Sequence, residues 1–183
     1  EARGVMPNTL AGHSFVKGQL TVMMVDGPCF HRGPHDQEWL PIEQGQSIRH
    51  NDSLRTGSRG YLVLAWSSDN MIMIKPSSGL RVSVQPQMIP QVSLHLHRAE
   101  VMLAARDSGI VEIVGRHGAL MLNHGESSYT SLPEYEMIRA IKGSSALRLS
   151  GSAEATLIPE SYSLKINDDG SSNPLVMFDP QSE

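Results

Sequence analysis

The stretch from Gly45 to Val84 constrains the fold of this chain more than any other part of the sequence. Within it, apolar and polar residues alternate in short runs, at 47–49, 61–66, 71–75 and 80–84. Alternation with a period of two is typical of β-strands, because successive side chains of a strand point to opposite faces. The Gly, Asn, Asp, Ser and Pro residues between the runs favour tight turns. The stretch therefore predicts a meander of strands joined by hairpins.

The rest of the chain repeats this pattern. Strands are expected at 19–25, 92–104, 110–114, 119–122, 129–132, 136–141, 146–149, 155–158 and 162–166. The run 92–104 alternates for longest, and its phase becomes ambiguous after Ala99, which indicates a bulge or a bend. No segment favours a helix beyond a single turn within 94–106. We therefore predict an all-β fold, a β-sandwich or jelly-roll-like roll of short antiparallel strands with irregular termini.

Composition excludes some classes of function. The chain has 183 residues and a net charge of -4, so it lacks the basic character of a nucleic-acid binder. It contains no apolar run of about 18 residues, so no membrane span is expected. Cys29 is the only cysteine, which rules out an internal disulfide, and we interpret it as a packing residue rather than a reactive thiol. The sequence begins at Glu1 instead of Met, which suggests a processed chain or part of a longer one, with any signal or anchor upstream.

The central stretch also resembles the core of the FecR domain family. The matching residues are Gly45, Ile48, Asn51–Asp52, Leu54–Gly57, Gly60, Ser68–Asn70 and Pro76–Ser78. Asn51 and Asn70 replace the glycine that is commoner in the family, and Asn is the next best residue at positive φ. The match is weaker in the second half, where 157–166 resembles the closing segment. The family's Arg-Gly-Thr-x-Phe element is not visible at its expected place, and the nearest candidate, 115–118, lacks the Thr and the aromatic residue.

The composition of the two ends predicts a domain organisation, and the resemblance implies a class of function. We expect an irregular lead-in or docking arm at 1–18, a FecR-like β domain at 19–170 and a flexible tail at 171–183, frayed unless 175–178 pairs with a sheet edge or a neighbour. FecR-like domains imply a non-enzymatic protein-interaction module of the bacterial cell envelope, in the periplasm or outer envelope, acting as a scaffold or assembly component. Its partners would be envelope proteins or other copies of this chain. The alternative is a periplasmic signal-relay domain of a FecR-type regulator.

His95, His97 and Glu100 are candidate metal ligands. Alternation places both imidazoles on one face of a strand, with a carboxylate nearby, which resembles part of a cupin motif with altered spacing. A cupin-like metal-binding enzyme or sensor is therefore a third hypothesis, and solvated histidines on an exposed strand face are the structural alternative. No paired carboxylates, nucleophile motif or phosphate loop is present, so no catalytic residue and no cofactor are assigned.

Other residues are candidates for contacts and turns. Arg49, Arg55, Arg59 and Arg81 could form a basic patch for an anionic glycan or a lipid head group, or belong to a solvated sheet face. The apolar residues expected at a protein interface are Phe15, Val16, Leu175, Val176 and Phe178. The residues expected at structural turns are Asp52, Thr56, Gly57 and Pro76, with Gly57 at positive φ. Trp39 and Trp66 are expected to be at least partly buried.

Overall fold

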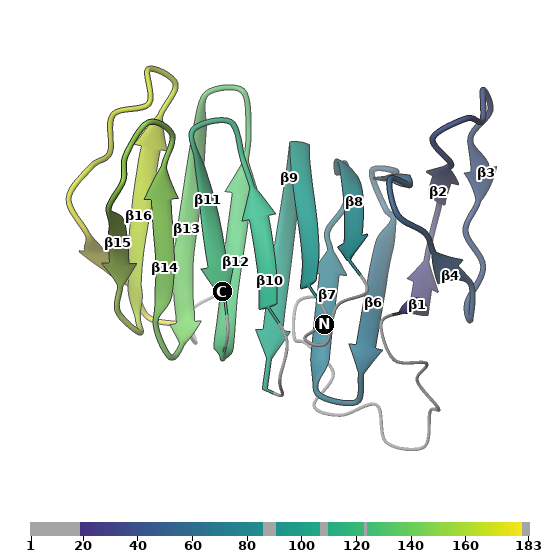
Figure 1. The fold of residues 1–183 in the computed structure, drawn as a ribbon, viewed down its shortest axis with the longest axis horizontal. Coiled ribbons are helices and arrows are strands. Elements are labelled where there is room, and N and C mark those ends of the chain that lie inside the picture. Colours follow the sequence, from purple (N-terminus) through teal and green to yellow (C-terminus); the bar gives the residue numbers. More distant parts are fainter. Residues whose placement is uncertain (1–18, 86–90, 107–109, 123, 181–183) are drawn as a thin grey trace.

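Alternating residues build 17 strands and no helix in the part of the chain that the structure, a computed structural model, describes: residues 19–85, 91–106, 110–122 and 124–180. The strands lie side by side along the long axis of the molecule, with the early strands at one end and the late strands at the other (Figure 1). They form two sheets packed face to face, which confirms the predicted all-β sandwich. Among these residues, no helix could carry the chain across a membrane.

Each sheet has a simple order of strands. In sheet A the order is β4 (Ser47–Ile48), β1 (Leu20–Asp26), β6 (Tyr61–Ser67), β7 (Asn70–Ile74), the second half of β9 (Gln91–Ala105), β12 (Gly125–Ser131), β13 (Tyr135–Lys142), β16 (Tyr162–Asn167) and β17 (Val176–Met177). In sheet B the order is β3 (Leu40–Pro41), β2 (Cys29–Arg32), β5 (Ser53–Thr56), β8 (Gly79–Gln85), the first half of β9, β10 (Ile110–Val114), β11 (Gly118–Leu122), β14 (Ser145–Leu149) and β15 (Ala155–Ile158).

Strand β9 belongs to both sheets. Residues 91–98 pair with β8 in sheet B, whereas residues 99–105 pair with β12 in sheet A. The pairing with β8 skips His97, because Leu80 faces Leu96 and Gly79 faces Arg98. This bulge reverses the alternation, so that Leu96 before it and Ala99 after it are both buried. The bulge or bend that the sequence predicts is therefore present. The pairing of β9 with β10 is parallel, which the prediction of antiparallel strands did not include.

The core fills the space between the sheets along their whole length. It joins Leu20, Leu64, Leu94, Tyr129 and Ile166, each 0% exposed, in one continuous cluster. A second cluster contains Met23, Val63, Ala65, Met71, Met73 and Ala104. Along β6, Val63 and Ala65 of this second cluster alternate with Leu62, Leu64 and Trp66 of the main core. Strand β6 is therefore buried on both faces. Strands buried on both faces lose the polar alternation of a solvated sheet.

Candidate functional site

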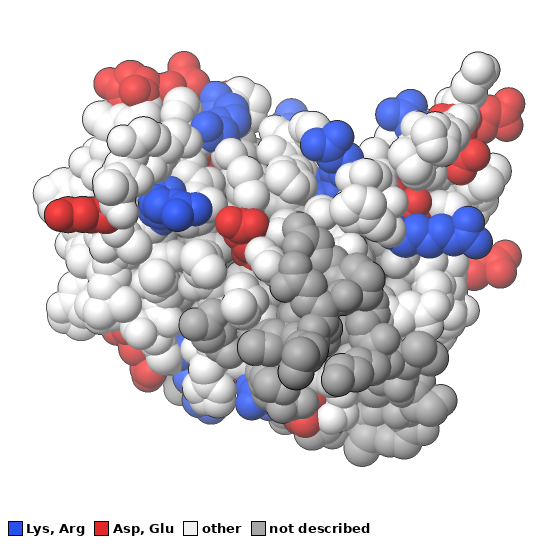
Figure 2. Space-filling model, viewed as in Figure 1, with Lys and Arg blue, Asp and Glu red and all other residues white. Residues whose placement is uncertain are grey.

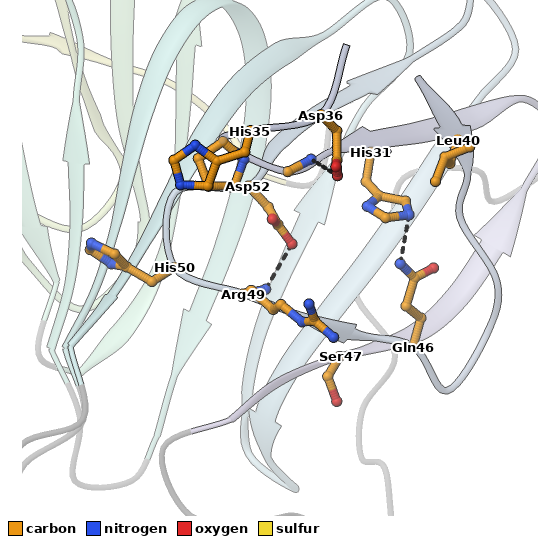
Figure 3. Close-up of a pocket in the computed structure, with 11 residues that line it drawn as sticks. His31, His35, Asp36, Leu40, Gln46, Ser47, Arg49, His50 and Asp52 are labelled. Atoms are coloured by element: carbon orange, nitrogen blue, oxygen red, sulfur yellow. Dashed lines mark hydrogen bonds between the residues drawn. The ribbon is translucent and has the colours of Figure 1, made fainter. Parts of the chain in front are cut away.

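A pocket of about 580 Å³ lies at the end of the sandwich that carries β2, β3 and β4 (Figure 3). Its lining includes three of the eight histidines of the chain, together with one arginine and two aspartates: His31, His35, His50, Arg49, Asp36 and Asp52. These residues come from β2, which contains His31, from the β2–β3 connection and from the turn between β4 and β5. Sequence reasoning missed this pocket, although three histidines between positions 31 and 50 were a visible signal.

Two aspartates fix the turns that form the pocket wall. Asp36 accepts a hydrogen bond from the backbone N–H of Gly33 at 3.1 Å through Oδ2. Asp52, which is 4% exposed, accepts one from the N–H of Arg49 at 2.8 Å through Oδ2. Asn51, in the same turn as Arg49 and Asp52, has a φ of 67°, as its place in the FecR-like turn predicted. Short side-chain bonds to the nearby backbone are the usual reason for Asp and Asn in turns.

His31 presents a buried and unused donor in this pocket. Its Nε2 lies 2.8 Å from Nε2 of Gln46, whose Oε1 accepts a hydrogen bond from the N–H of Glu43. An amide nitrogen can only donate, so Nε2 of His31 is the acceptor and the ring proton sits on Nδ1. Nδ1 is buried and has no hydrogen-bond partner among the described residues. Figure 3 shows this pair on one side of the pocket and His35 and His50 on the other.

The four arginines of the expected basic patch occupy different environments. Arg55 stacks over Phe30 and Trp39, with its Cζ 4.9 Å and 4.5 Å from the ring centroids, and Arg32 also stacks over Trp39 at 4.8 Å. Arg49 lines the pocket and has neither an ion pair nor a ring contact in the described ranges. On the face shown in Figure 2, Lys and Arg are interspersed with Asp and Glu, so no surface of a single sign forms there.

The remaining two arginines of that set lie apart from the pocket. Arg81 is exposed on β8, where it pairs with Ser53 of β5, and Arg59 is exposed in the turn between β5 and β6. Arg81 is also paired with His95 of β9, so its charge lies beside that imidazole.

The structure separates the expected metal ligands. His95 lies in the sheet B half of β9, and His97 is the exposed residue at the bulge. Glu100 lies beyond the bulge in sheet A and forms an ion pair with Lys75 at 2.5 Å. Burial lowers the pKa of His95, and the charges of Arg81 and His97 act in the same direction, whereas Glu112 opposes them. No three His, Cys, Asp or Glu side chains in the described ranges are arranged to hold a metal ion.

The expected apolar contact residues lie partly at the far end of the sandwich. Val176 and Met177 form the edge strand β17, and their side chains are 59% and 68% exposed. Leu175 is exposed, and the ring of Phe178 is half-buried with Arg139 5.8 Å from its centroid. Strand β17 pairs with β16, and the structure describes the tail as far as residue 180. The sequence predicted a frayed tail unless 175–178 pairs with a sheet edge, and this pairing is present. Phe15 and Val16 lie outside the described residues.

The turn residues hold neighbouring loops together. Thr56 Oγ1 donates to the carbonyl of Lys75 at 2.7 Å and accepts from the N–H of Ser78 at 3.0 Å. Pro76 opens the turn between β7 and β8, in which Ser77 has a φ of 57°. Trp66 is 5% exposed and Trp39 is half-buried, as predicted.

Two expectations about positive φ were wrong. Gly57 does not have a positive φ, and a Cβ at this position would lie 2.7 Å from Cγ of Pro28. Glycine is therefore needed there for a close approach of two loops. Asn70 also has an ordinary φ, and its Oδ1 accepts a hydrogen bond from the N–H of Arg106 at 2.9 Å. Gly57 lies in the turn after β5 and Asn70 is the first residue of β7, and contacts between segments explain both residues better than local backbone conformation does.

Cys29 is a buried structural thiol. Its Sγ contacts the carbonyl oxygen of Tyr61 at 3.4 Å, and the side chain is 3% exposed. Burial, with a smaller contribution from the charge of Asp26, raises the pKa of Cys29 to about 11. A thiol with a raised pKa is a poor nucleophile near neutral pH, because the thiolate is the reactive form.

Comparison with known proteins supports the fold. No protein-family model matches the sequence, and no curated protein matches it. The structure is similar to two crystal structures of a "putative anti-sigma factor" from Parabacteroides distasonis ATCC 8503, with TM-scores of 0.57 and 0.58 and 9% sequence identity. Each match covers 70% of this chain and 61% of that chain, so the likeness spans less than two thirds of the neighbour's length. At this identity the likeness concerns the fold alone.

Proposed function

We propose that this chain is a FecR-type protein-binding domain that relays signals in the bacterial cell envelope, on the periplasmic side. The observation that carries this proposal is the likeness of 70% of the chain to the anti-sigma factor structures. The FecR-like residues support it, because they build the β5–β8 region, in which Thr56 and Gly57 hold loops together. Fold alone does not determine function, so the proposal also needs a surface that can bind a partner.

The exposed end of the sandwich supplies such a surface. Strand β17 is the last strand of sheet A and β15 is the last strand of sheet B in the described residues. Val176, Met177 and Leu157 expose 59%, 68% and 60% of their surface on these two strands. Edge strands with exposed apolar side chains favour pairing with another chain, which adds backbone hydrogen bonds as well as apolar contacts. We propose that the partner protein of the signal relay binds at this end of the sandwich.

A double substitution at the edge tests the proposal. Val176→Lys with Met177→Lys would place two charges in the partner contact, so transcription that depends on this domain should be lost in the bacterium that encodes it. Leu40→Lys is the matched control, because Leu40 is 47% exposed on the short edge strand β3 at the opposite end. The control should leave transcription unchanged. If removal of the whole domain changes envelope assembly without changing transcription, a scaffold is the correct function and the relay is wrong.

A further inference from the structure

We propose that the pocket lined by Arg49 and the histidines binds an acidic sugar, that is, a monosaccharide unit that carries a carboxylate. This inference is independent of the protein-binding function. A pocket of about 580 Å³ has the size of a small-molecule site. Its walls are held by side-chain bonds to backbone N–H groups at Gly33 and Arg49, so the pocket is preformed.

Arg49 is the group that would bind the carboxylate. Among the arginines near this end, Arg32 and Arg55 are engaged with aromatic rings, whereas Arg49 has no ion pair or ring contact in the described part of the chain. A guanidinium group binds a carboxylate through two parallel hydrogen bonds, which gives both affinity and orientation. An uncommitted arginine at the wall of a preformed pocket therefore favours a ligand with a planar anionic group.

The other polar groups of the pocket match the hydroxyls of a sugar better than a bare anion. Asp36 and Asp52 each use Oδ2 for a turn, and the second oxygen of each carboxylate accepts no hydrogen bond from the described residues. Two carboxylates repel phosphate, which is close to doubly charged, more strongly than a ligand with a single carboxylate, and they accept well from hydroxyl groups. Acceptors around one cationic group are the complement of a ligand with several hydroxyls and one carboxylate.

Protein-observed NMR titration with glucuronate, glucose and inorganic phosphate tests the proposal on the full chain. Glucuronate should shift the signals of the pocket residues with a dissociation constant on the order of 1 mM, as expected for a ligand of this size. Glucose should bind at least about fivefold more weakly because it lacks the carboxylate. Absence of pocket shifts with glucuronate, or tighter binding of phosphate than of glucuronate, would overturn the proposal.

Substitutions of pocket residues test whether glucuronate binds in this pocket. Arg49→Gln should weaken glucuronate binding by about tenfold, and His35→Ala, an exposed pocket residue, should weaken it by a smaller factor. Arg148→Gln is the matched control, because Arg148 is an exposed arginine on β14, far along sheet B from the pocket. Arg49 is itself exposed, so all three variants should keep the melting temperature of the wild type. Equal binding by the Arg49→Gln variant and the wild type would show that the carboxylate is not bound here.

Discussion

At the scale of single residues, several side chains are explained by contacts between segments that lie far apart in the sequence. Gly57 was expected at positive φ, yet the ring of Pro28 is what excludes a side chain there. The turns that Asp52 and Asn51 form could be predicted, because their hydrogen bonds and backbone angles are local. The close approach of Gly57 to Pro28 could not, because it depends on the pairing of β2 with β5.

Substitution of Gly57 measures this close approach. Gly57→Ala should reduce the free energy of unfolding by about 1–3 kcal/mol, because the new Cβ would displace the ring of Pro28. Gly79→Ala is the control, since no atom lies within 4 Å of the corresponding Cβ position and its φ is not positive. Urea denaturation gives both values. Equal stability of the two variants would contradict the explanation.

The thiol of Cys29 should make the stability of the fold depend on pH in the alkaline range. The unfolded thiol ionises above its ordinary pKa of 9.0, whereas the folded thiol stays protonated up to a pKa of about 11. The unfolded state then binds fewer protons, so the free energy of unfolding falls as pH rises from 9 to 11. Urea denaturation should show a fall about 1–2 kcal/mol larger for the wild type than for Cys29→Ala. Parallel curves for the two proteins would rule out this contribution.

At the scale of elements, β9 shows how far alternation predicts structure. The alternation of 92–104 and the change of phase near Ala99 were both visible in the sequence. What the sequence did not indicate is that the strand leaves one sheet for the other, or that β10 runs parallel to it. Alternation specifies which side chains face inward, but it carries no information on the neighbouring strand. The pocket was missed for a related reason, since its residues lie in loops that have no period.

Removal of His97 tests the bulge. Deletion of this single residue should turn Ala99, Val101 and Leu103 from the core towards solvent and abolish cooperative unfolding. His97→Ala keeps the residue count and should change the free energy of unfolding by less than about 0.5 kcal/mol, because His97 is exposed. Circular dichroism during thermal unfolding distinguishes the two outcomes. A deletion variant with a sharp, wild-type transition would show that the bulge is dispensable.

At the scale of the whole molecule, a buried carboxylate ties the two sheets together. Glu136 of β13 in sheet A is 0% exposed and accepts hydrogen bonds from the N–H groups of Arg116 and His117, at 2.8 Å and 2.9 Å, in the β10–β11 turn of sheet B. Ser131 Oγ donates a third bond at 3.1 Å. The signal was present in the sequence, because Glu136 occupies the inward phase that it shares with Ile138 and Ala140.

Loss of this carboxylate should weaken the whole sandwich. Glu136→Ala removes the acceptor of two part-buried N–H groups and of Ser131 Oγ, so the free energy of unfolding should fall by about 2–4 kcal/mol. Glu154→Ala is the control, because Glu154 is exposed on the β14–β15 connection. Guanidinium denaturation followed by tryptophan fluorescence measures both, since Trp66 reports the core of the opposite half. A loss below about 0.5 kcal/mol for Glu136→Ala would mean that water replaces the carboxylate.

Strand β9 has a mechanical consequence. It stands between β7 and β12 in one sheet and between β8 and β10 in the other, so it joins the two halves of the molecule in both sheets at once. Tension applied to the two ends of the domain must therefore pass through this one strand. The two halves can therefore part only after hydrogen bonds of β9 have ruptured in both sheets.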